Sequence, residues 1–164
     1  MSKPMKPIVN LNELDDYQSD ENGKYAESYS PVSDKIGAKN LSYSVTIVPP
    51  GKRVCPMHNH HVSEEMFMIL EGQGTLRFGD KEYPIKALDV IACPPGGQEV
   101  AHQIINTSDK ELKYFCLSDT PTADIVEYPD SNKTLSLVRK SENNKGFRHI
   151  SSLAESVDYY HDEQ

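Results

Sequence analysis

Two histidines that lie two residues apart, His58 and His60, most constrain how this chain can fold. On an extended strand such a pair points to one face, so both imidazoles would reach the same space. Glu65 follows at the start of an apolar run, and His102 is the candidate for a further ligand from a distant part of the chain. Imidazole nitrogens and carboxylate oxygens suit divalent iron, manganese, nickel, copper and zinc. The four side chains therefore predict a mononuclear transition-metal site, because burying them without a metal would be costly.

The sequence from residue 41 onward is typical of short strands separated by turns. The first segment alternates apolar and small polar side chains, as a half-buried strand does, with apolar members at Leu41, Tyr43, Val45 and Ile47. After it, Gly, Pro, Asn and Asp mark the turns, and we expect strands at 54–60, 65–70, 75–78, 81–85, 89–93, 102–106, 112–117, 124–127 and 134–138. This pattern, without alternating helices, favours an all-β sandwich or barrel.

The spacing of the glycines around the histidines resembles the first motif of the cupin family. Gly51 precedes His58 and His60, Glu65 follows them, and Gly72 closes the stretch. The chain has one residue more before the first histidine than that motif usually has. The resemblance concerns fold and metal ligands and does not specify a reaction.

A second stretch resembles the second cupin motif. Pro94-Pro95-Gly96 is followed by His102 and then by Asn106 at the expected distance. Two features depart from the motif: Leu88 stands where the leading glycine would be, and the loop 97–101 is longer than usual. Without the glycine, the tight turn before the expected strand 89–93 would have to form with Leu88. The longer loop changes where His102 lies along the chain relative to Gly96.

The resemblance implies an all-β fold, the cupin double-stranded β-helix or jelly-roll barrel, in a single-domain bacterial protein of the cupin_2 type. It covers about residues 41–163. We expect an N-terminal arm at 1–40, the cupin barrel at 41–138 and a C-terminal tail at 139–164. The implied cofactor is one divalent transition metal (Fe, Mn, Ni or Zn) on His58, His60, Glu65 and His102.

Two neighbours of the predicted ligands are weaker candidates for the same role. His61 has the opposite strand parity to His60 and is expected at the surface or behind the ligands. Glu64 would replace Glu65 only if a β-bulge shifted the register. Side chains that could line the pocket, each of which ordinary barrel packing would also explain, are Tyr43, Phe67, Gln103, Asn106 and Tyr114.

The two ends of the chain are polar and carry weaker patterns. Ile8, Val9 and Leu11 could form a short edge strand, in an arm that crosses to a second subunit or stays partly ordered. Near the other end, Ser152 and Glu155 fit a capping box. We expect one short helix over 152–160 that docks an apolar stripe on the barrel, with a disordered acidic tail as the alternative.

Composition excludes several classes of partner. A net charge of −8 without a basic cluster argues against nucleic acid and anionic membrane. The chain has no apolar run of the roughly 20 residues that a span needs, and no signal-peptide core. Three distant cysteines do not make a disulfide framework. We therefore expect a cytoplasmic protein, and a homodimer that covers exposed strand edges.

Fold alone does not assign a reaction. The first hypothesis is a metal-binding cupin that binds or acts on a small polar molecule, as a dioxygenase or an isomerase if it is an enzyme. A sugar-phosphate isomerase should carry basic side chains at the pocket mouth, and only Lys52, Arg53 and Arg77 are near candidates. The hypothesis from another class is a non-catalytic small-molecule binder or sensor.

Overall fold

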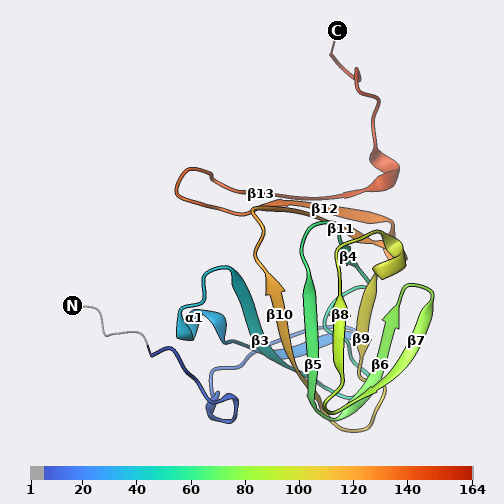
Figure 1. The fold of residues 1–164 in the computed structure, drawn as a ribbon. Helices are drawn as coiled ribbons and strands as arrows, with labels where there is room; N and C mark the ends of the chain where they lie inside the picture. The colour runs from blue at the N-terminus through green and yellow to red at the C-terminus, as the bar shows by residue number, and fades with distance from the viewer. Residues whose placement is uncertain (1–5, 164) are drawn as a thin grey trace.

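The computed structural model describes residues 6–163, and its regular elements are mainly β-strands (Figure 1). The strands in chain order are β1 (Gln18–Asn22), β2 (Tyr25–Pro31), β3 (Leu41–Val48), β4 (Asn59–His60), β5 (Glu65–Glu71), β6 (Gln73–Phe78), β7 (Lys81–Lys86), β8 (Val90–Cys93), β9 (His102–Ile105), β10 (Leu112–Asp119), β11 (Ala123–Tyr128), β12 (Lys133–Val138) and β13 (Phe147–Ser152). The helical segments are α1 (Ser33–Ile36) and the 3₁₀ turns η1 (Leu11–Glu13), η2 (Gln98–Val100), η3 (Pro129–Ser131) and η4 (Leu153–Glu155). The all-β fold class predicted from the sequence is confirmed.

The strands form two layers. One layer is a six-stranded sheet in the order β1-β2-β3-β10-β5-β8. The other combines the sheet β7-β6-β9 with the sheet β13-β12-β11-β4, because the residues before β4 bridge to β9 at Arg53–Ile105 and His58–His102. In Figure 1 the strands β11 to β13 lie across one end of the other strands. All pairs within the named sheets are antiparallel.

The core lies between these layers and sets the register of β5. Phe67 and Ile69 are buried, whereas Met66 and Met68, which alternate with them, are half-buried. Glu65 has the same parity as Phe67 and Ile69, which brings the carboxylate to the inner face, as the sequence predicts. The buried cluster draws on both layers and consists of Val48, Phe67, Ile69, Leu76, Ile85, Ile91, Cys93, Ile104, Leu112 and Tyr114.

Strand β3 is buried differently from its alternating pattern. Ser44 and Thr46 are buried, and they face a cavity rather than solvent. Val45 on the other face is buried as well, in a sheet that β2 extends and α1 contacts. Leu41 is exposed. The expectation that the apolar residues of this strand face the interior is therefore wrong. Ser44 and Thr46 line the cavity, and Val45 is buried on the opposite face.

The N-terminal residues add two strands to the six-stranded sheet. β1 and β2 pair with each other, and β2 pairs with β3. The expected edge strand at residues 8–11 is wrong: Ile8 is exposed, and the side chain of Asn10 accepts a hydrogen bond from the Asn12 amide to start η1. The division of the chain at residues 40 and 138, and an arm that crosses to a second subunit, stay predictions.

The C-terminal residues form a strand followed by one helical turn. β13 pairs with β12 over its whole length. The helix expected over 152–160 begins at its predicted cap, where Ser152 accepts from the Ala154 amide, but it is only the 3₁₀ turn η4. Ser156 has an extended backbone, and Val157 is 65% exposed. A helix this short is not stable without tertiary packing, and the apolar side chains Leu153 and Val157 are exposed instead of packed on the barrel.

Among residues 6–163, no helix combines the length and the apolar character needed to cross a membrane.

The turn between β7 and β8 holds Leu88 in a left-handed conformation, with φ at 75°. The second cupin motif has glycine at this position, and the turn forms here without it. The Leu88 amide donates to the Ile69 carbonyl at 2.8 Å, which ties the turn to β5. The leucine side chain is 74% exposed and gains little from packing. A non-glycine residue in this region costs about 1–2 kcal/mol.

We expect Leu88→Gly to stabilise the protein by about 0.5–1 kcal/mol. Relief of the left-handed strain outweighs the entropy that glycine loses on folding, which is also about 0.5–1 kcal/mol. Urea denaturation of the purified protein measures the difference. Leu88→Ala is the matched control, because it removes the side chain and keeps the strain, so its stability should stay close to wild type. A Leu88→Gly variant less stable than Leu88→Ala would contradict the left-handed turn.

Candidate metal centre

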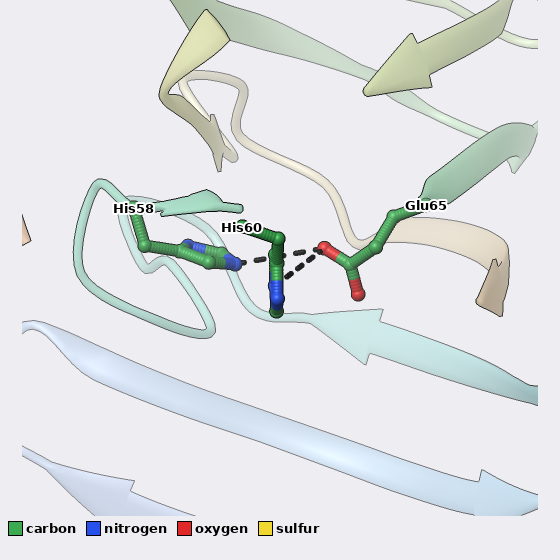
Figure 2. Close-up of side chains that lie close together, drawn as sticks. All are labelled: His58, His60 and Glu65. Carbon is green, nitrogen blue, oxygen red and sulfur yellow. Dashed lines mark ion pairs between the residues drawn. The ribbon is translucent and has the colours of Figure 1, made fainter. Parts of the chain in front are cut away.

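Four side chains from three places in the chain meet at one point between the layers. His58 and His60 lie on the segment that enters β4, Glu65 begins β5, and His102 begins β9. His58 and His102 are directly opposite each other, and their backbones exchange two hydrogen bonds of 3.2 and 2.8 Å. Figure 2 shows His58, His60 and Glu65 with their side chains turned toward one another. The longer loop before His102 therefore does not keep it from reaching the same place.

A single carboxylate oxygen is the centre of the cluster. The Oε2 atom of Glu65 lies 3.6 Å from Nε2 of His58, 3.4 Å from Nε2 of His60 and 3.1 Å from Nε2 of His102. The candidate ligand atoms of His58, His60 and Glu65 all lie within 4.8 Å of one another. His102 is buried, and the other three side chains are half-buried.

The opposite ring nitrogen of each histidine faces a hydrogen-bond acceptor. Nδ1 lies 2.9 Å from the Pro56 carbonyl in His58 and 3.3 Å from the Val100 carbonyl in His102. In His60 it lies 2.6 Å from Oδ2 of Asp124. Carbonyl and carboxylate oxygens only accept, so Nδ1 must carry the proton in all three rings. The Nε2 atom of each ring then points toward Glu65, as a donor when the ring is protonated and as a lone pair when the ring is neutral.

This arrangement fits a divalent cation. Three nitrogen lone pairs and a carboxylate oxygen would repel one another unless a proton or a metal ion lies among them. Nδ1–H bonds to carbonyl or carboxylate groups are the usual support of metal-bound histidines. Nitrogen and oxygen donors of this kind suit the late first-row transition metals and zinc. The residues present therefore match the cofactor that the sequence predicts.

The charge of Glu65 also controls the protonation of the neighbouring rings. Burial opposes protonation of His58, but the adjacent Cys55 and Glu65 outweigh it and hold its pKa well above the usual value. For His60, burial is likewise outweighed by Glu65 and Asp124, and its pKa is raised. Both rings therefore take up protons readily when no metal is bound, and a metal must displace those protons.

His102 and Glu65 shift in the opposite direction. Burial is the largest influence on His102 and lowers its pKa despite the hydrogen bond to Glu65. Burial alone would raise the pKa of Glu65, yet hydrogen bonds from His102, His58 and His60 lower it far below the usual range. Glu65 is therefore an anion at neutral pH, and His102 is available as a neutral ligand.

The cluster opens into a cavity of about 450 Å³. Three of the four predicted ligands line it, and so do the predicted pocket residues Phe67 and Tyr114. The rings of Phe67 and His102 lie 5.8 Å apart, so Phe67 packs directly against the cluster. The other side chains of the wall are Glu27, Tyr29, Ser44, Thr46, Val54, Cys55, Pro56, Ser63, Cys116, Ser118, Asp124, Val126, Tyr128, Leu135, Leu137 and Arg139.

The other three predicted pocket residues lie outside the cavity wall. Tyr43 packs against Phe115 on the opposite face of the sheet, because its parity differs from that of Ser44. Buried Gln103 accepts from Arg77 and donates to the Cys55 carbonyl, 2.7 Å away. Fully buried Asn106 donates to the carbonyls of Val48 and Lys110 and accepts from Ser108. Gln103 and Asn106 hold loops in place around the site.

The two weaker ligand candidates lie away from the cluster. His61 is exposed, and its Nε2 lies 3.5 Å from Oε2 of Glu127 on the outer side. Glu64 is exposed, and its backbone amide donates to Asp119. No bulge brings Glu64 inward, because β5 pairs with β8 in regular register from Glu65 onward.

Sequence reasoning missed Asp124, Cys55 and Arg139. Asp124 lies within the predicted strand 124–127 with the parity of buried Val126, which was the available signal for an inward carboxylate. Cys55 lies 3.6 Å from Nδ1 of His58, and its closeness in sequence to that histidine was a signal. Arg139 directly follows β12 and reaches the cavity from the layer opposite β3. Nothing in the sequence shows that β12 lies over the site.

The fold and the cluster define a double-stranded β-helix protein with a candidate metal centre. Residues 44–118 match the family described as the cupin domain. This segment therefore belongs to the cupin superfamily, and the resemblance seen in its two motifs is confirmed.

The chain is similar to one relative of known sequence and to proteins of known structure, and the structures share its fold. An uncharacterised protein of Methanocaldococcus jannaschii, MJ1618, is 35% identical over 80 residues, which are 49% of this chain and 61% of that protein. The chain thus spans less than two thirds of that relative. A structure from Acidithiobacillus ferrooxidans, provisionally named a sugar phosphate isomerase, covers 93% of this chain and 96% of its own, with a TM-score of 0.81 and 23% identity.

A second structure, from Thermotoga maritima, is named a predicted oxalate decarboxylase. It covers 70% of this chain and 99% of its own, with a TM-score of 0.59 and 25% identity. The two names differ in reaction, so the shared architecture assigns the fold without assigning the chemistry.

We expect Asp124→Asn to weaken the binding of added Zn²⁺ by about 10–100-fold, because an amide no longer fixes the His60 ring as the carboxylate does. Competition with a chromophoric chelator measures the affinity. Asp119→Asn is the matched control: Asp119 also accepts from a side chain and a backbone amide, those of Ser63 and Glu64, but does not contact a histidine. Equal affinities of folded Asp124→Asn and wild type would show that Asp124 does not orient His60.

Proposed function

We propose that this cupin binds one divalent transition metal through His58, His60, Glu65 and His102, and that it binds or transforms a small polar molecule in the adjoining cavity. The observation that supports this proposal is the convergence of three Nε2 atoms on one carboxylate oxygen, with every Nδ1 facing an acceptor. In a chance cluster of histidines we would not expect all three rings to have Nδ1 against an acceptor and Nε2 toward the same carboxylate.

The ligand set favours a working centre over a structural one. Structural zinc sites are usually closed by four ligands that include cysteine, whereas three nitrogens and one oxygen leave places free on a six-coordinate metal. The bound metal would supply Lewis acidity or, if it is iron, a site for dioxygen. Phe67 and Tyr114 would limit water on the buried side of the centre. We propose iron, manganese, nickel or zinc as the metal.

Two alternatives remain as proposals. A sugar-phosphate isomerase would need basic groups near the metal, and Lys52, Arg53 and Arg77 do not line the cavity, although Arg139 does. A non-catalytic binder or sensor would use the same cavity without turnover. The isomerase and the binder both require a bound small molecule. Measurements of metal content and of small-molecule binding therefore come before any assay of activity.

We also propose a homodimer. Edge strands β8 and β13 carry exposed apolar side chains, with Val90 on the first and Phe147 and Ile150 on the second. Unpaired edges of this kind are commonly covered by a second copy of the chain.

Protein purified without chelator or nickel resin should contain close to one equivalent of transition metal. The His58→Ala, His102→Ala double variant should lose it, because only two of four ligands remain. Elemental analysis measures the content, and His61→Ala is the matched control, since its ring faces Glu127 instead of the cluster. A wild-type protein that is purified without metal and does not bind added Fe²⁺, Mn²⁺, Ni²⁺ or Zn²⁺ would contradict the proposal.

Metal affinity should fall as the pH is lowered. The pKa values of His58 and His60 are raised in the metal-free protein, so protons occupy these rings below those raised values and must leave when the metal binds. Above the raised values the rings are neutral and affinity levels off. Each displaced proton weakens binding by about tenfold per pH unit. Calorimetry in two buffers of different ionisation enthalpy counts the released protons, and zero release at about pH 6 would contradict the cluster.

A further inference from the structure

The cavity beside the candidate metal centre contains one arginine and no lysine in its wall. Arg139 follows β12, and it lines the same cavity as His58, His60 and Glu65. It is exposed, as a residue at the mouth of the cavity would be. A ligand in this space would therefore meet the metal on one side and a guanidinium group on another.

The guanidinium group of Arg139 is held in place and still has donors available. Its Nε donates to the Pro121 carbonyl at 3.0 Å, and its backbone amide donates to the Thr122 carbonyl at 2.8 Å. Within residues 6–163, no carboxylate lies within 4.0 Å of it and no partner is recorded for its two terminal nitrogens. Arg77, by contrast, is fully engaged in a two-bond ion pair with Asp130. The Nε atom of Arg139 is thus fixed, and its two terminal nitrogens are available to a ligand.

The acidic side chains of the cavity do not neutralise Arg139. Glu65 is directed to the three histidines, and Asp124 accepts from His60 and from the Val62 amide. Glu27 is the remaining carboxyl in the wall. It lies on β2, and no ion pair joins it to Arg139 within the described residues. None of these carboxylates is paired with the guanidinium of Arg139, so its charge is available to an anionic group of a ligand.

Three residues of the wall offer hydroxyl groups without a hydrogen bond to the described part of the protein. Ser44 and Thr46 on β3 and Ser118 on β10 line the cavity, and their hydroxyls make no side-chain hydrogen bond within the described residues. Ser44 and Thr46 are buried, so only a ligand or water in the cavity can satisfy them. A wall of this kind suits a molecule that carries hydroxyl groups of its own.

We propose that the cavity takes a small hydroxylated anion, whose carboxylate or phosphate group pairs with Arg139 while a neutral oxygen faces the metal. An arginine with two free terminal nitrogens can bind either anion with paired hydrogen bonds. The volume of about 450 Å³ is within the range of small-molecule sites. This inference rests on the proposed metal function, because it names the class of molecule that the same site would take.

The test compares glucose, gluconate and glucose 6-phosphate with zinc-loaded wild type, by calorimetry at constant ionic strength. We expect one or both anions to bind more tightly than glucose. Arg139→Gln should weaken anion binding by about 10–100-fold, which corresponds to the usual contribution of a hydrogen bond to a charged group. The affinity for glucose should not change. Lys140→Gln is the matched control, because it removes the adjacent exposed charge outside this cavity.

Binding of gluconate alone would identify a carboxylate as the anionic group, and binding of glucose 6-phosphate alone would identify a phosphate. Equal binding of glucose and both anions, no binding of either anion, or anion binding that Arg139→Gln leaves unchanged would overturn the inference. Metal content is measured on every sample. Loss of metal from the wild type would count against the proposed function, while anion binding that still depended on Arg139 would uphold this inference separately.

Discussion

A set of hydrogen-bond acceptors that face one another is the constraint on which the rest of the structure depends. The Nε2 atoms of His58, His60 and His102 surround Oε2 of Glu65 at 3.1 to 3.6 Å, and the opposite ring nitrogens are already engaged. Such a set is stable only around positive charge, as protons or as a metal ion. The surrounding strands can tolerate this cost because they are tied together by regular antiparallel ladders and a continuous apolar core.

Each layer of the fold supplies a different part of the centre. The six-stranded sheet contributes Glu65 and the hydroxyl-bearing wall of β3. The opposite layer contributes the histidines, and β11 and β12 within it add Asp124 and lead to Arg139. The residues after the family-matched segment 44–118 are therefore part of the site, since both Asp124 and Arg139 lie in them. The cupin segment provides the ligands, and the strands that follow shape the space around them.

Local spacing in the sequence was enough to predict the ligands, and long-range pairing was needed for the rest. His58 and His60 share a face because of strand parity, and Glu65 shares the parity of Phe67, so these positions could be predicted from the sequence alone. The sequence could not show that β11 pairs with β4, which brings Asp124 to His60. The inner face of β3 was also predicted wrongly, because Ser44 and Thr46 face a cavity where the alternating pattern suggested solvent. β13 was missed because its side chains are mostly exposed and carry little periodic signal.

The mutual backbone hydrogen bonds between His58 and His102 have a consequence for how the centre can come apart. In an antiparallel pair of this type the two residues exchange both of their bonds, so their separation is set by the sheet and not by the side chains. The two ligands cannot move apart unless this pair opens. Opening it would loosen the segment before β4 from β9, although the Arg53–Ile105 bridge and the hydrogen bond from Gln103 to the Cys55 carbonyl would still join them. The relative position of these two ligands is thus fixed by backbone pairing, so a substitution that disturbs the pairing would change the shape of the centre without removing a ligand.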